Sequence, residues 1–143
     1  MPLDSQTPDD ATAVVRLTTP LAAADALAAF TDTDRLARWY WPARLAPRYT
    51  GSLTVAGVLH ARSDVADMGF TATVTATDES GFACDWQWDG DEDVTTVRVE
   101  VTAAESGGSV VTVIHAANPS VQARDDHEAG WRSCLERLDA ARG

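Results

Sequence analysis

The sequence predicts an α+β fold in which a curved antiparallel sheet of about six or seven strands wraps around one long C-terminal helix. Two observations lead to this prediction. Apolar and polar residues alternate in a series of short segments through the middle of the chain. In residues 120–142, by contrast, the apolar residues recur at offsets of three and four, as on one face of a helix. A sheet with one apolar face must cover that face, and only the C-terminal helix is long enough to do so.

The first strand is expected at residues 12–18, and two short helices should follow it. The alanine-rich residues 21–30 predict the first helix, and residues 33–39 predict the second, with Asp32 or Thr33 as its N-cap. Residues 1–11 contain prolines and aspartates without an apolar pattern, and we expect them to form a flexible lead-in. Residues 12–143 should then form a single domain.

The central segments predict a β-meander. Alternation is clearest over residues 70–77, 82–89, 97–102 and 111–115, and segments rich in Asp, Ser and Gly separate these runs. In the first of them the residues expected to point inward are Phe70, Ala72, Val74 and Ala76. Two further strands are expected around Leu53–Val55 and Leu59–Ala61.

The final helix has an unusual buried face. Six residues share that face by their spacing: His127, Gly130, Trp131, Cys134, Leu135 and Leu138. A helix that only covers a core would have aliphatic residues throughout this stripe. The imidazole, glycine, indole and thiol therefore indicate that the helix covers a roomier and more polar space.

Composition excludes several classes of function. The net charge of -11 disfavours nucleic acid and anionic membrane surfaces, which require clustered cations. No apolar run approaches the roughly 20 residues of a membrane span. All basic residues are arginine, so a lysine Schiff base is unavailable. Two cysteines, Cys84 and Cys134, are too few for a disulfide framework, and we expect both as free thiols in a cytoplasmic protein.

The ordered set of motifs resembles the START-like (SRPBCC) superfamily, and within it the branch named for the activator of heat-shock-protein-90 ATPase. The residues that carry this resemblance are Phe30-Thr31-Asp32, Leu36, Trp39, Trp41-Pro42, Met68-Gly69, Trp86 to Gly90, Gly108-Ser109, His115 and Asp126 to Trp131. The resemblance implies the helix-grip (START/Bet v-like) fold for residues 12–143. It also implies a cavity between sheet and helix, which relatives use for lipids, hormones or polyketide-like molecules.

Indole and imidazole groups converge on the faces predicted to enclose this cavity. Its expected ligand-binding wall consists of Trp39, Trp41, Phe70, Trp86, Trp88, His115, His127 and Trp131. Two histidines without an inward carboxylate or thiolate make an incomplete metal site, so no metal is expected. No phosphate-binding loop or dinucleotide fingerprint appears, so no cofactor is expected either.

Three functions remain open at this stage. The first is a non-enzymatic module that binds a small apolar or amphipathic molecule. The second is a cyclase or hydrolase with His115 and His127 as acid and base, although both histidines could equally be satisfied by backbone or water. The third is a stress-related protein-interaction role as a chaperone adaptor. The sequence also leaves a homodimer open.

Overall fold

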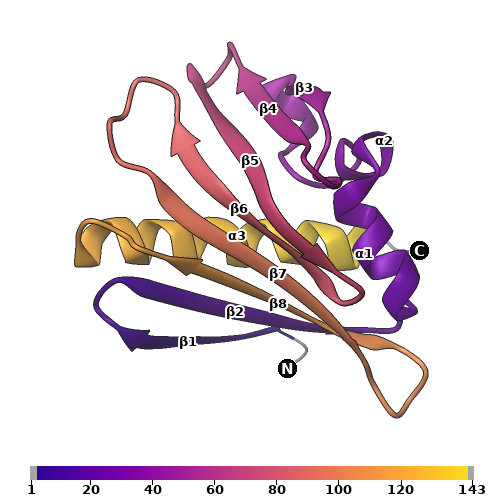
Figure 1. Cartoon of the computed structure of the whole chain (residues 1–143). Helices are drawn as coiled ribbons and strands as arrows, with labels where there is room; N and C mark the ends of the chain where they lie inside the picture. Colours follow the sequence, from indigo (N-terminus) through magenta and orange to yellow (C-terminus); the bar gives the residue numbers. More distant parts are fainter. Residues whose placement is uncertain (1–2, 142–143) are drawn as a thin grey trace.

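One large antiparallel sheet and a long C-terminal helix make up the fold (Figure 1). The computed structural model describes residues 3–141. Its elements, in order, are β1 (Leu3–Asp9), β2 (Thr12–Thr19), α1 (Ala23–Thr31), α2 (Thr33–Leu36), a 3-10 turn η1 (Ala43–Leu45), β3 (Arg48–Gly51), β4 (Val58–Ser63), β5 (Met68–Asp78), β6 (Gly81–Trp88), β7 (Thr95–Ala103), β8 (Ser109–Ala116) and α3 (Val121–Ala141). The strand order is β1-β2-β8-β7-β6-β5-β4-β3. The predicted α+β helix-grip fold is confirmed, with eight strands in place of the six or seven expected.

The core lies between α3 and the face of the sheet that α3 crosses (Figure 1). Alternation places Val97, Val99 and Val101 of β7 on this face, where all three are buried. Four residues of α3 are buried against the sheet: Trp131, Cys134, Leu135 and Leu138. This confirms the apolar part of the predicted helix face.

The prediction of a flexible lead-in over residues 1–11 is wrong for the residues that the structure describes. Residues 3–9 form β1, which pairs with β2 at the edge of the sheet. A turn joins the two strands, and in it the Ala11 amide donates to Asp9 Oδ1 at 2.8 Å. Arg132 of α3 donates to Ser5 Oγ at 2.7 Å, so the helix also holds this strand. Met1 and Pro2 also belong to the expected lead-in, and they lie outside the described residues.

The strand expected at Leu53–Val55 is a loop, and β3 instead precedes it at Arg48–Gly51. Leu53 is buried although it lies in the loop, whereas Val55 is exposed. Gly51 allows the close pairing that ends β3: its φ is +79°, and a Cβ there would collide with the Val58 carbonyl oxygen. The apolar residues 53 and 55 therefore predicted a strand in the loop that follows β3.

One helix and one strand also differ in detail from the prediction. The register of β5 shifts between Val74 and Ala76, so the inward alternation ends at Val74 and Ala76 is exposed. Asp32 caps α2 as expected, but α2 ends at Leu36. At the start of α3 the amide of Ala123 donates to Ser120 Oγ at 3.1 Å, so Ser120 caps this helix. The predicted end of α3, Arg142, lies outside the described residues.

Both cysteines are unpaired and buried. Burial raises the pKa of the Cys84 thiol to about 12 and that of the Cys134 thiol to about 11. Within residues 3–141, no helix is both long and apolar enough to cross a lipid bilayer.

The state of the thiols is the first testable prediction. A thiol-reactive chromophore should titrate two thiols in the denatured, unreduced protein, because neither cysteine has a disulfide partner. In the native protein both should react slowly at pH 8, since burial disfavours the thiolate. A denatured count of zero, or fast reaction of both native thiols, would contradict this assignment.

The second prediction concerns the contact of α3 with the sheet. Trp131→Ala should lower the free energy of unfolding by about 3–5 kcal/mol, because it removes a buried indole from the centre of this contact. Urea melts of the two proteins measure the difference. A loss below about 1 kcal/mol would mean that Trp131 does not pack between helix and sheet.

Candidate functional site

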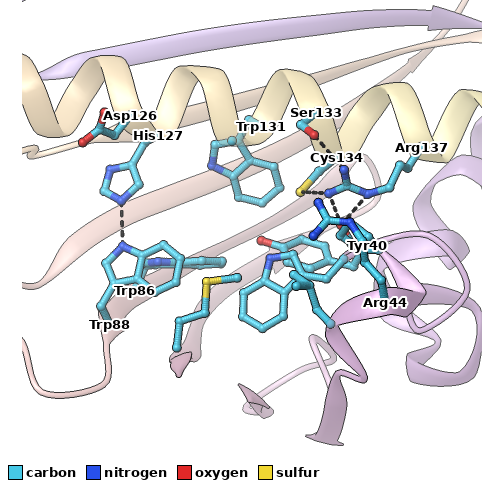
Figure 2. A pocket seen from close by; sticks show the side chains of 15 residues that line it. Tyr40, Arg44, Trp86, Trp88, Asp126, His127, Trp131, Ser133, Cys134 and Arg137 are labelled. Carbon is cyan, nitrogen blue, oxygen red and sulfur yellow. Dashed lines mark hydrogen bonds between the residues drawn. The ribbon is translucent and has the colours of Figure 1, made fainter. Parts of the chain in front are cut away.

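An open groove of about 330 Å³ lies between α3 and the sheet (Figure 2). It runs beneath the middle of α3, above the ends of β5 and β6 and beside the segment that follows α2. The groove is lined by Tyr40, Trp41, Pro42, Arg44, Leu45, Met68, Trp86, Trp88, Asp126, His127, Gly130, Trp131, Ser133, Cys134 and Arg137.

Aromatic side chains from three parts of the chain form most of the groove wall. The period of two in β6 puts Trp86 and Trp88 on the same face. Trp131 comes from α3, and its ring lies 5.7 Å from that of Trp86 and 5.8 Å from that of Tyr40. Phe70 of β5 lies underneath, stacked on Trp86 with 3.7 Å between ring centroids. This stacking supports the floor of the groove.

A hydrogen-bond chain beneath the groove joins α3 to the sheet through His115. The Trp131 indole donates to His115 Nδ1 at 2.9 Å. An indole nitrogen can only donate, so Nδ1 accepts and the neutral ring carries its proton on Nε2. Nε2 then donates to Thr95 Oγ1 at 2.7 Å, and the Thr95 hydroxyl donates to the Trp86 carbonyl at 3.3 Å.

A second chain of the same kind passes through His127. The Trp88 indole donates to His127 Nε2 at 2.8 Å (Figure 2). His127 therefore carries its proton on Nδ1, which donates to Asn118 Oδ1 at 2.6 Å. The amide nitrogen of Asn118 donates in turn to the carbonyls of Ala11 and His115, at 2.8 and 2.9 Å. The two histidines are thus opposite tautomers.

Both imidazoles are held neutral. The rings of His115 and His127 stack with 4.0 Å between centroids and 11° between planes. Burial, and to a smaller extent the neighbouring His127, lower the pKa of His115 to about 3. Burial also lowers the pKa of His127, against the smaller opposite effect of Asp126 and Asp91. Since protein groups occupy all four ring nitrogens, neither histidine has a nitrogen left for a substrate.

At one end of the groove, Arg137 fixes the segment after α2 to α3. Its Nη2 donates to the Tyr40 carbonyl at 2.6 Å and its Nη1 donates to Ser133 Oγ at 2.6 Å. Its Nε bridges the carbonyls of Trp39 and Tyr40 at 3.1 and 3.2 Å. This guanidinium holds Tyr40 and Trp41 in place as a wall.

Five of the eight residues predicted for the cavity wall line the groove: Trp41, Trp86, Trp88, His127 and Trp131. Three do not. Trp39 is buried on the far side of this wall, where its indole donates to the Ala29 carbonyl at 3.1 Å. Phe70 and His115 are completely buried beneath the groove.

Sequence reasoning missed most of the polar lining, including Arg44, Asp126, Ser133 and Arg137. The last three occupy positions on the same flank of α3, next to the predicted stripe. Their spacing relative to His127 and Trp131 could have predicted this, because residues at the edge of the buried helix face can line a groove as well as those at its centre. Arg44 lies in η1 and follows no pattern that predicts its place.

The groove has room at Gly130. This glycine lies inside α3, and a Cβ built on it would meet no atom within 4 Å. Among residues 3–141, no group of three or more His, Cys, Asp or Glu side chains is arranged to hold a metal ion.

Comparison with known proteins identifies relatives of this fold. Residues 22–143 match the family described as activator of Hsp90 ATPase homolog 1-like protein. Ms6760 from Mycobacterium smegmatis is 17% identical, with a TM-score of 0.77 over 98% of this chain and 96% of its own. CalU16 from Micromonospora echinospora is 18% identical, with a TM-score of 0.72 over 95% of this chain and 80% of its own.

A third similar structure is PFC0360w, an HSP90 activator from Plasmodium falciparum. It is 15% identical, with a TM-score of 0.71 over 91% of this chain and 94% of its own. At these identities the likeness shows the fold alone. No curated protein has a significantly similar sequence.

The third prediction follows from the neutral state of His115. Unfolded His115 takes up a proton near pH 6.5, whereas the folded residue resists protonation until about pH 3. Its contribution to stability is therefore complete above pH 7 and is lost as the pH falls from 6.5, by about 1.4 kcal/mol per pH unit. His115→Asn, which keeps an acceptor for Trp131 but cannot titrate, should lose correspondingly less stability between pH 6.5 and 4.5.

Urea melts of both proteins at each pH measure this difference, since the other titrating groups are common to both. Equal pH dependence in the two proteins would contradict a neutral, buried His115.

Proposed function

The chain belongs to the family of activator of Hsp90 ATPase homolog 1-like proteins, and on this premise we propose that it is a non-catalytic module that binds a small apolar or amphipathic molecule in the groove between α3 and the sheet. The groove volume of about 330 Å³ is within the usual range for small-molecule sites. Its wall of indole rings with Met68 and Leu45 suits a flat, largely apolar body.

The observation that supports this proposal most strongly is the glycine inside α3. Glycine in a helix interior costs about 1 kcal/mol relative to alanine. No steric reason excludes alanine at Gly130, because a Cβ there points into open space. Glycine lowers the stability of the helix at a position where alanine would fit. This is explained if a side chain at residue 130 would occupy space that a ligand needs.

A second observation concerns the groove floor. The indole nitrogen of Trp86 is the buried side-chain polar atom in the described structure that has no hydrogen-bond partner. An unpaired buried donor costs stability, and such groups call for a functional explanation. An acceptor brought by a ligand, or by a water that enters with it, would satisfy this donor.

The cyclase or hydrolase alternative has less support because neither His115 nor His127 is free to act as acid or base. All ring nitrogens of His115 and His127 are engaged, and both rings are held neutral. Burial holds the pKa of the Tyr40 phenol well above its usual range, and it also raises the pKa of the Cys134 thiol. Acid–base catalysis by these histidines or this phenol, or nucleophilic attack by this thiol, would need the group in its reactive form.

The adaptor alternative is favoured by one observation, the similarity to an HSP90 activator from Plasmodium falciparum. A docking surface for a protein client would ordinarily be an exposed apolar patch. The exposed large apolar side chains of residues 3–141 are valines in loops and at element ends: Val55, Val58, Val65, Val94 and Val121. An increase in the ATPase rate of purified Hsp90 on addition of this protein would favour the adaptor.

The two buried thiols suit a reducing compartment, and we propose that the protein is cytoplasmic.

The fourth prediction separates binding from stability at Gly130. Gly130→Ala should raise the free energy of unfolding by about 0.5–1 kcal/mol, because it removes the helix penalty without a clash. Gly130→Leu should remain at least as stable as the natural protein but weaken binding of the neutral probe N-phenyl-1-naphthylamine about tenfold or more, because its side chain fills the groove. Probe fluorescence measures binding, and urea melts measure stability.

Ala129→Leu is the matched control, since residue 129 is exposed on α3 but does not line the groove. It should leave probe binding unchanged. Unchanged binding in Gly130→Leu, with the fold intact, would mean that the groove is not the binding site.

A further inference from the structure

Several arginines of this chain are paired with neighbouring carboxylates. Five of them form ion pairs: Arg35, Arg48, Arg62, Arg98 and Arg124. Arg44 differs from these. It is exposed, lines the groove, and has neither an ion pair nor a hydrogen bond with any residue from 3 to 141.

A second positive charge lies at the same end of the groove. Figure 2 shows Arg44 and Arg137 beyond Trp131, at the end away from His127. Arg137 donates to backbone carbonyls, a hydroxyl and a thiol, and to no carboxylate of the described chain. Two guanidinium charges in one small groove repel each other, and an anion near both would offset this repulsion.

The opposite end of the groove has the opposite character. Asp126 lies there beside His127, which is neutral (Figure 2). An anion would be repelled at this end and attracted at the other. The groove is thus polarised along its length, with aromatic walls between a positive end at Arg44 and a negative end at Asp126.

From this arrangement we propose that the ligand is an amphipathic aromatic acid, whose flat body lies between the indole rings and whose anionic group binds Arg44 at the groove mouth. The inference rests on the proposed binding function and adds the chemical class and the orientation of the ligand. A guanidinium suits this task because it can donate two parallel hydrogen bonds to a carboxylate or sulfonate. Arg137 contributes its charge, while its donors remain bound to the protein.

A matched pair of fluorescent probes tests the role of the anion. The probes are 1-anilinonaphthalene-8-sulfonate and N-phenyl-1-naphthylamine, which share the same ring system and differ in the sulfonate. Arg44→Gln should weaken binding of the sulfonate probe about fivefold to tenfold and leave the neutral probe within twofold. Arg44→Lys, which keeps the charge, should retain most of the affinity for the sulfonate probe.

Arg38→Gln is the control, because Arg38 is also exposed and without an ion pair but does not line the groove. It should change neither affinity. The inference is overturned if both probes bind and Arg44→Gln leaves them unchanged or weakens them equally, although the binding function would then stand. If neither probe binds the natural protein, the proposed function itself fails.

Discussion

Two indole N–H groups, each donating to an imidazole, determine how α3 packs on the sheet. Trp131 reaches His115 at 2.9 Å from the helix side, and Trp88 reaches His127 at 2.8 Å from the sheet side. The two imidazoles stack on each other, so the pairs form one unit that joins β6, β8 and α3. A hydrogen-bonded network of this kind favours a single geometry, because any other arrangement leaves donors or acceptors unpaired. The unit therefore sets the separation between helix and sheet, and with it the height of the groove.

This constraint also decides the chemistry of the groove. All ring nitrogens of the two histidines bond to protein partners, so His127, which lines the groove, presents its ring there without a free nitrogen. The aromatic walls then offer dispersion and apolar contact, while Arg44 and Asp126 supply charge at opposite ends. A site built in this way can hold and orient a molecule. These contacts are what the proposed binding module requires.

The sequence predicted those features that depend on periodicity and missed those that depend on backbone pairing. Alternation in β6 and β7 and the helical stripe at Trp131, Cys134 and Leu135 correctly identified the buried faces. β1 was missed because only Leu3 is an inward apolar residue, and its strand is held mainly by pairing with β2. His115 and His127 lie side by side, but spacing in the sequence cannot show that their nitrogens bond to protein partners and not to a ligand in the groove. Arg44 lies in the turn η1, whose path depends on how Tyr40 and Trp41 pack against α3. No local sequence pattern predicts this packing.

The central claim is that a ligand enters the groove between α3 and the sheet, and the five indole N–H signals test it most directly. In the ¹⁵N-labelled protein these signals can be assigned by single Trp→Phe variants and followed during titration with N-phenyl-1-naphthylamine. The account predicts that the signals of Trp41, Trp86, Trp88 and Trp131, which line the groove, shift with the probe. The signal of Trp39, whose indole is bonded to Ala29 behind the wall, should stay in place. No shift in any of the four groove signals, or a shift of Trp39 as large as theirs, would contradict the account.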